Sequence, residues 1–190
     1  MGSIKIIIGL IAGIIGGLCF IPYIKDIFLF KTKPHMYTWL IWSLLQITSV
    51  IIMLNNGSGI GALPFAVGSL LCGFVFILSF KYGTKNVTLS DTVCLIGALI
   101  ALFFYIFLKN PVASIILVCV IDLIGFIPTF RKSYVEPKTE TSSTYIVSAF
   151  SSILAVIALT NYSLITMLYP ITLVITDSTC WLIITLRRKI

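Results

Sequence analysis

The feature that most constrains this sequence is a series of apolar runs, each about 20 residues long and almost free of charge. A helix of about 20 residues spans the hydrocarbon core of a bilayer, which is roughly 30 Å thick. Only 10% of the 190 residues are charged and 59% are hydrophobic, whereas a soluble domain carries roughly 25% charged residues. The pattern predicts an integral membrane protein whose spans are helices and not barrel strands.

Seven membrane spans can be predicted from these runs, with boundaries good to a few residues. They cover residues 4–24, 37–54, 60–80, 89–108, 111–129, 143–160 and 163–186. The first run ends in Pro22 and Lys25 and has no small-residue cleavage site, so we expect a mature helix and not a cleaved signal peptide.

A short sequence motif, Phe-Ile-Pro at residues 20–22, recurs at residues 126–128, which is an offset of 106 residues. The same offset places Thr38-Trp39 on Thr144-Tyr145, Pro64 on Pro170, and Lys81 on Arg187. Several landmarks in one register indicate an internal repeat, and the prolines are the most informative because apolar helices align with one another easily.

The cations predict how the chain crosses the membrane. Of the 13 Lys and Arg residues, only Lys5 and Lys109 fall outside four segments that share one side of the membrane. These segments are 25–33, 81–85, 131–138 and 187–189. The positive-inside rule then places the N-terminus outside and the C-terminus in the cytoplasm, and we expect the cell (inner) membrane. The net charge of +7 is expected to face anionic lipid, so we expect no nucleic-acid partner.

Repeat and topology together predict the fold. A unit of three helices leaves the chain on the opposite side of the membrane, so two copies in one orientation need one helix between them. The predicted fold is all-α, with seven transmembrane helices as two parallel three-helix bundles joined by a linker helix. The first repeat is expected at 1–84, the linker helix at 85–110 and the second repeat at 111–190.

This organisation, with a proline motif at the end of each first helix and a basic loop after it, resembles the SWEET, SemiSWEET and PQ-loop superfamily of transporters over residues 4–187. The motif pairs here are Pro22-Tyr23 and Pro128-Thr129 and not proline-glutamine, and spans two and six lack the proline of sugar-transporting members. The resemblance implies that the third helix of each unit lies between the first two, with a cavity between the units near the membrane midplane.

The resemblance predicts a carrier that moves a small polar solute, such as a sugar, an amino acid or a vitamin-like compound, by alternating access. The alternative is a receptor, sorting or regulatory protein that uses the same fold without transport. No nucleophile and base pair, metal-ligand spacing or phosphate loop occurs, so we expect no enzyme, no metal and no cofactor. The expected partners are the solute, the lipid bilayer and, as an open alternative, further copies of the chain.

Asp122 and Asp177 are the two acids predicted to lie deep in the membrane. They lie about 11 and 13 residues below the outer ends of their spans, so both are roughly 16 to 20 Å down. A buried carboxylate is costly unless it is paired, hydrogen-bonded or protonated, so both are candidates for solute binding and proton coupling. Alternatively, they bond nearby Ser and Thr and hold helices together. The repeat places Gly16 and Leu71 at the equivalent positions, so we expect the second half to carry ion coupling and the first to contribute shape and aromatic surface.

Pro22 and Pro128 are predicted hinges, because a proline removes a backbone hydrogen bond and presses on the carbonyl four residues earlier. The alternative is ordinary helix termination near the cytoplasmic ends. Pro64 and Pro170 are expected in the first turn of their helices, where proline is tolerated.

Trp42 and Gln46, one turn apart on span two, are the candidate solute-binding residues of the first half. Trp181, four residues after Asp177, is a further candidate for the cavity wall. For Trp39 and Trp42 we favour an interfacial aromatic belt, and the functional alternative is that Trp42 closes an inner gate or stacks on the solute. A glycine face at residues 9, 13 and 17 predicts close helix packing, either within the bundle or across a homo-oligomer.

Overall fold

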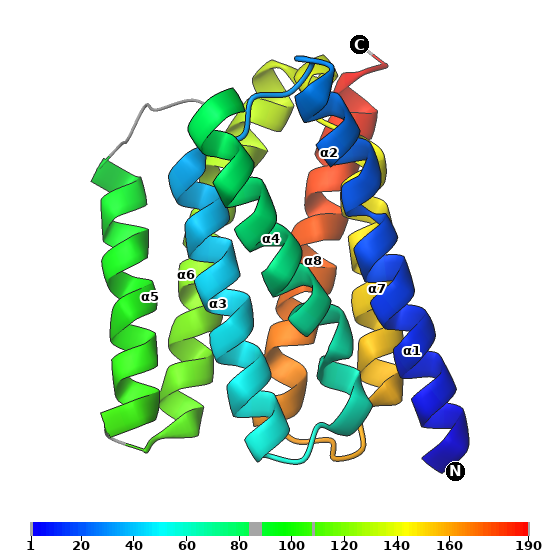
Figure 1. Cartoon of the computed structure of the whole chain (residues 1–190), viewed down its shortest axis with the longest axis vertical. Helices are drawn as coiled ribbons and strands as arrows, with labels where there is room; N and C mark the ends of the chain where they lie inside the picture. Colours follow the sequence, from blue (N-terminus) through cyan, green and yellow to red (C-terminus); the bar gives the residue numbers. More distant parts are fainter. Residues whose placement is uncertain (1, 84–88, 108, 190) are drawn as a thin grey trace.

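The apolar runs form the long helices of the computed structural model, which describes residues 2–83, 89–107 and 109–189. The elements are α1 (Gly2–Leu18), α2 (Phe20–Phe28), α3 (Met36–Asn55), η1 (Gly59–Ala62), α4 (Leu63–Tyr82), α5 (Leu89–Phe107), α6 (Pro111–Val135), η2 (Pro137–Thr139), α7 (Ser142–Ala158) and α8 (Leu164–Arg187). The long helices stand side by side, with α5 at one edge of the bundle (Figure 1). Residues 84–88, which include Lys85 and the predicted boundary between the first repeat and the linker helix, and residue 108 of the predicted linker lie outside the described residues.

Within the described ranges, five helical segments are long and apolar enough to cross a membrane. They are Gly2–Phe28, Met36–Asn55, Gly59–Tyr82, Pro111–Val135 and Leu164–Arg187. α7 is also apolar but has 17 residues, and the apolar part of α5, Leu95–Phe107, is shorter as well. Length and composition therefore indicate an all-helical, multi-pass membrane protein.

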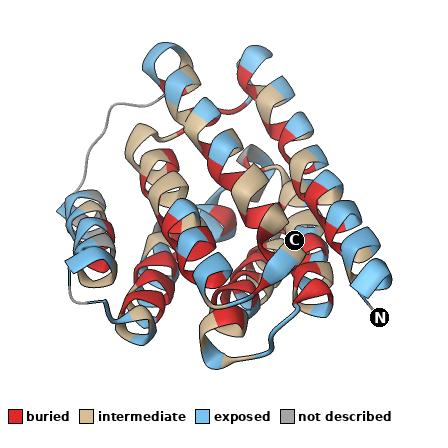
Figure 2. Cartoon of the chain, turned by 60° about the horizontal axis from the view of Figure 1, so that its bottom comes forward, coloured by how far each residue is buried: buried red, intermediate tan, exposed pale blue. Residues whose placement is uncertain are grey.

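The packing places the third long helix of each half between the other two. In the first half α4 contacts α1 and α3, and in the second half α8 contacts α6 and α7. As far as the described residues show, α1 does not touch α3 and α6 does not touch α7. The halves meet where α1 packs on α7 and where α3 packs on α6, and α5 covers α3 and α6. Buried residues lie on the sides that the helices turn toward one another (Figure 2).

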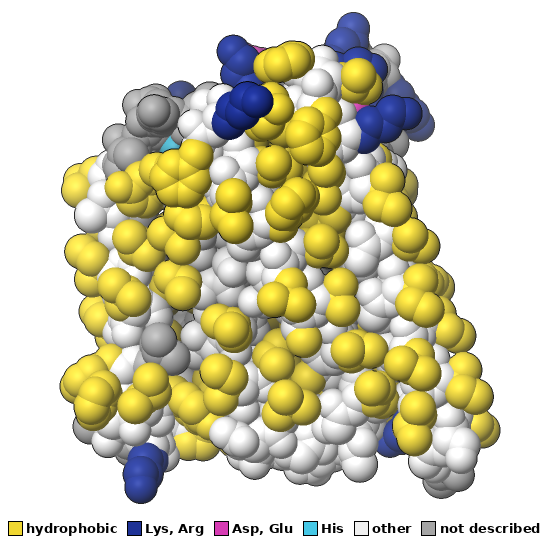
Figure 3. Space-filling view, viewed as in Figure 1, with side chains coloured by type: hydrophobic (Ala, Val, Ile, Leu, Met, Phe, Trp, Pro, Cys, Tyr) yellow, Lys and Arg dark blue, Asp and Glu magenta, His cyan; other side chains and the backbone are white. Residues whose placement is uncertain are grey.

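The outer surface is apolar along the helices, and charged side chains gather mainly at one end (Figure 3). Large apolar side chains cover the sides of the bundle, as lipid contact requires, and Lys and Arg side chains gather at the end where α2 and the C-terminus lie. We call this end, formed by residues 25–35, 131–141 and 187–189, the basic end. The opposite end, formed by residues 56–62 and 159–163, is called the far end.

The glycine face of α1 packs within the chain. A Cβ on Gly9 would lie 2.6 Å from Ile60 Cγ2, and a Cβ on Gly13 would lie 2.8 Å from Leu63 Cδ2. These distances are below van der Waals contact, so glycine permits the close approach of α1 to η1 and α4.

The prolines depart from several expectations. Pro22 lies in the first turn of α2, just after the helix is interrupted at Cys19, and α2 continues to Phe28. The backbone at Pro128 lies within α6, which continues past the predicted end at residue 129 to Val135, and the side chain of Pro128 is outside the described part. Interpreting these two prolines as helix ends is therefore wrong. Pro64 is in the first turn of α4 as expected, whereas Pro170 lies inside α8 and not in its first turn.

Candidate functional site

A cavity of about 900 Å³ lies between the two halves of the chain. Its walls come from α1 to α4 on one side and from α6 to α8 on the other. It opens at the basic end, where the exposed side chains of Arg131, Lys132 and Glu136 line it. A solute could therefore enter from the basic end and reach the middle of the bundle.

The far end is closed by contacts between the halves. The rings of Phe65 on α4 and Tyr169 on α8 lie 5.5 Å apart, and both line the deep part of the cavity. The Ser151 hydroxyl donates to the carbonyl oxygen of Ala12 at 2.8 Å, which joins α7 to α1. The backbone N–H of Thr160 donates to a carbonyl of residue 58 at 3.0 Å. The structure thus shows a cavity with one open end and one closed end.

The wall of the cavity repeats at the offset found in the sequence. Many lining residues fall into pairs that are 106 positions apart, one from each half. The pairs are Gly16 with Asp122, Phe20 with Phe126, Tyr23 with Thr129, Thr38 with Thr144, Trp39 with Tyr145, Trp42 with Ser148, and Gln46 with Ser152. Corresponding faces of the two halves therefore look into the same space.

Asp122 lies in the wall of this cavity, as predicted. It is placed by α6, is only 1% exposed, and its Oδ2 atom has no hydrogen-bond partner among the described residues. A buried carboxylate without a partner is strongly unfavourable if it stays charged, so this atom calls for a proton, a hydrogen-bond donor or a cationic partner.

Asp177 does not line the cavity, although it is equally deep in the fold and buried. Its Oδ2 accepts a hydrogen bond of 2.6 Å from the hydroxyl of Ser148, and Ser148 is a lining residue. The prediction that both acids line one cavity is therefore wrong for Asp177. Its helix turns the carboxylate toward α7, and Ser148 lies between it and the cavity.

Trp42 and Gln46 both line the cavity, as predicted. The Trp42 Nε1 atom is buried and has no acceptor among the described residues. The Gln46 amide nitrogen lies 3.2 Å from Cys72 Sγ, and a Cβ added to Gly68 would lie 2.1 Å from Gln46 Oε1. Glycine at position 68 is thus needed to admit the glutamine side chain.

Aromatic side chains form one cluster that extends from the mouth toward the deep part of the cavity and includes residues of both halves. Trp42 packs against Phe126 of α6 with ring centres 5.1 Å apart, and against Trp39 at 5.3 Å. Trp39 in turn lies 4.8 Å from Tyr23 and is 6% exposed. Interpreting Trp39 as part of an interfacial belt is therefore wrong, because its ring is buried against other rings and not against lipid.

Trp181 is not among the residues that line the cavity. It packs against the apolar core from α8, so its prediction as a cavity-wall residue is wrong. One turn of helix separates it from Asp177, and both lie on the face that α8 turns away from the open space.

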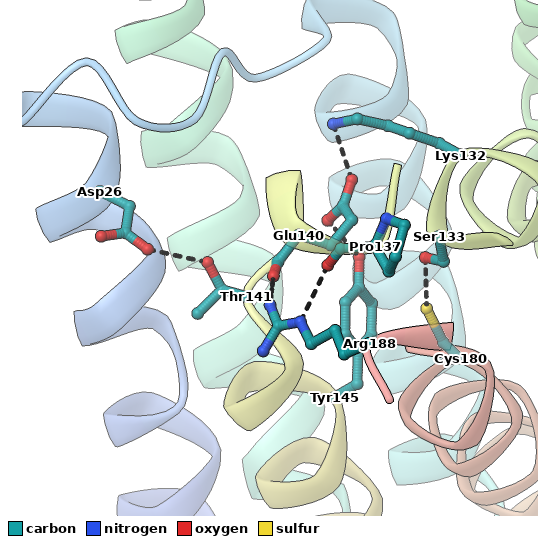
Figure 4. Close-up of polar contacts among 9 residues, drawn as sticks. All are labelled: Asp26, Lys132, Ser133, Pro137, Glu140, Thr141, Tyr145, Cys180 and Arg188. Carbon is teal, nitrogen blue, oxygen red and sulfur yellow. Dashed lines mark hydrogen bonds and ion pairs between the residues drawn. The ribbon is translucent and has the colours of Figure 1, made fainter. Parts of the chain in front are cut away.

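The mouth of the cavity is organised by Glu140 (Figure 4). Lys132 forms an ion pair with Glu140 at 2.7 Å, and the Tyr145 hydroxyl donates to the same carboxylate at 3.1 Å. The Thr141 hydroxyl donates to Asp26 at 2.9 Å and so links the start of α7 to α2 of the other half. Within the described ranges no cluster of three or more His, Cys, Asp and Glu side chains is placed to hold a metal ion.

Sequence reasoning missed several lining residues, notably Tyr23, Phe65, Ser148 and Tyr169. None of them carries charge, so none stands out in an apolar helix. The repeat contained a usable signal for Ser148, because it lies 106 residues after Trp42. Comparison of the chain with protein-family models, with curated proteins and with solved structures finds no match.

Proposed function

We propose that this protein is a membrane carrier of the SWEET, SemiSWEET and PQ-loop type, which moves a small polar solute by alternating access. Two parallel three-helix units, built from α1 to α4 and from α6 to α8, rock against each other, and α5 is the linker helix between them.

The observation that carries this proposal is the set of lining pairs 106 residues apart. A cavity between two repeats is the usual position of a substrate site in carriers built from internal repeats. The packing order, with α4 and α8 each in the middle of its half, supports the same organisation.

We assign the basic end to the cytoplasm of the cell (inner) membrane, following the distribution of Lys and Arg. On this assignment the conformation described above is open to the cytoplasm and closed on the outside. The outward-open state would then require the far-end contacts to separate and the aromatic cluster to close the inner side.

The residues take different roles in this scheme. Asp122, Trp42 and Gln46 contact the solute, because they line the deep half of the cavity. Asp177 reaches the cavity only through Ser148, so we assign it to proton coupling. The helix break before Pro22 and the proline at 128 are the candidate hinges of the two first helices.

Counterflow uptake into liposomes that contain the purified chain tests the carrier function. Thr129 lines the mouth on α6, so Thr129→Trp places a bulky ring in the path and should abolish uptake. Ile116→Trp is the matched control, because Ile116 lies on the same helix, is 44% exposed and faces away from the cavity. Equal uptake by both variants, or solute binding without any uptake, would refute the carrier and favour a receptor.

The coupling assignment has its own test. Uptake is measured against pH for the native chain, Asp177→Asn and Asp122→Asn. We expect the pH dependence to be lost in the Asp177 variant, and a dependence that is unchanged in both variants would remove proton coupling from the proposal.

A further inference from the structure

The deep part of the cavity holds two polar atoms that face no partner. Asp122 Oδ2 is an acceptor without a donor, and Trp42 Nε1 is a donor without an acceptor, and both residues line the cavity. They do not satisfy each other, although both line the same cavity. Buried polar groups are almost always paired, so an unpaired donor and acceptor in one cavity indicate the groups that a ligand supplies.

Trp42 reaches from α3 to α6, the helix that carries Asp122. The Trp42 Nε1 atom is 3.7 Å from the position that a Cβ on Gly125 would occupy. Gly125 is three residues after Asp122, so both lie on the same face of α6, one turn apart. A small molecule with a donor and an acceptor a few bonds apart can therefore reach both groups at once.

The surroundings of these two atoms are aromatic. Trp42 packs against Phe126, which lies one turn after Asp122, and against Trp39. The Lys and Arg residues of the described lining are Lys33, Arg131 and Lys132, and all three lie at the mouth. Among the described residues, none lines the deep part. Glu136 and Glu140 lie at the mouth beside them, so the entrance carries both signs of charge.

We propose that the cavity binds a small solute with a protonated primary amine and an oxygen acceptor on one short skeleton, as in an amino alcohol. The amine donates to Asp122, while the oxygen accepts from Trp42 Nε1. This assignment rests on the proposed function and names its substrate class. A neutral sugar supplies no counter-charge and requires Asp122 to stay protonated, and a carboxylate solute is repelled by the ionised form of Asp122.

Binding to the purified full-length chain tests the amine. The probes are ethanolamine, glucose and lactate, and the readout is calorimetric affinity together with the shift in thermal unfolding. Asp122→Asn keeps the size of the side chain and should lower ethanolamine affinity at least about 30-fold. Asp26→Asn is the control, because it also removes one carboxylate but lies outside the cavity, and its affinity should be unchanged. Binding of glucose or lactate in place of ethanolamine, or full affinity in Asp122→Asn, overturns the proposal.

A second variant tests the oxygen contact and does not depend on the folding of Asp122→Asn. The native chain should bind ethanolamine about 3- to 10-fold more tightly than ethylamine, which is the difference in affinity expected from one hydrogen bond. Trp42→Phe keeps a ring and removes the N–H, so this preference should disappear while ethylamine affinity changes little. A preference that is absent in the native chain or that survives in Trp42→Phe contradicts the assignment.

Uptake measurements separate this inference from the carrier function. Ethanolamine that binds but is not taken up into liposomes would refute transport and leave the amine site standing. Uptake of glucose or lactate without ethanolamine binding would refute the amine site and leave the carrier standing.

Discussion

Gly61→Ala should force the far end of the protein to open. Gly61 lies in η1 and packs directly on α7 of the other half. A Cβ at this position would lie 2.7 Å from Leu159 Cδ2, 2.8 Å from the carbonyl oxygen of Ala155 and 3.1 Å from Leu159 Cα. Two of these three atoms belong to the backbone of the other half, so no side-chain rotation can remove the overlap.

The size of the effect follows from these distances. Relief of the overlap requires η1 and α7 to separate by about 0.7 Å, because the new Cβ would lie 2.8 Å from the Ala155 carbonyl oxygen and atoms that are not bonded pack at roughly 3.5 Å or more. Overpacking of this kind costs about 1 to 3 kcal/mol. If the cost falls only on the state whose far end is closed, the ratio of open to closed molecules rises by about 5- to 150-fold.

Hydrogen exchange at the far end measures this shift. The amide of Thr160 donates to the carbonyl of Ser58 across the seam between the halves, so its exchange reports the opening of that seam. Exchange at Thr160 should accelerate by the same factor in Gly61→Ala. Gly73→Ala is the control, because its new Cβ would lie 3.4 Å from Ser43 Oγ, an ordinary contact within one half.

An unchanged exchange rate at Thr160 in Gly61→Ala would refute this reasoning. It would mean that the structure accommodates the new methyl group while the contact between η1 and α7 stays closed, and that the far-end contacts do not restrain the two halves. Equal acceleration in both glycine variants would also contradict it, because the control leaves the seam untouched.

The remaining predictions concern single hydrogen bonds. Ser148→Ala leaves the buried Asp177 carboxylate without its donor. In an unfolding assay, this variant should lower the free energy of unfolding by about 1 to 3 kcal/mol. Ser152→Ala, one turn away on α7, should change stability far less, and equal losses would argue against the bond. Ser163 caps α8 by accepting from the backbone N–H of Thr166, so Ser163→Ala should cost about 1 kcal/mol in the same unfolding assay. No loss in that variant would show that packing alone holds the start of α8.

The positions of the helices were predictable, because membrane spans depend mainly on the length of an apolar run. The predicted end of α6 at residue 129 was too early. The chain turns basic there, but cations leave a helix intact when they lie at its water-facing end, and α6 continues to Val135. The residue before Pro137 is disfavoured in a helix, and this is where α6 stops.

The cavity residues were predictable only in part. Depth along a helix follows from counting residues, and it placed Asp122 and Asp177 at similar levels. Which way each carboxylate faces depends on the rotation of its helix about its own axis, and neighbouring helices set that rotation. α6 therefore turns Asp122 to the cavity, whereas α8 turns Asp177 to Ser148.

The two seams between the repeats differ in a way that explains why the acid occurs in one half only. On the α1–α7 seam the position equivalent to Asp122 is Gly16, where a Cβ would lie 2.9 Å from Ser151 Oγ and 3.5 Å from Pro64 Cβ. A carboxylate cannot occupy that space, because the seam is closed there. On the α3–α6 side Asp122 lies in the wall of a cavity without a partner of its own. The two halves therefore differ at these corresponding positions, because one seam is closely packed and the other leaves an acid without a partner.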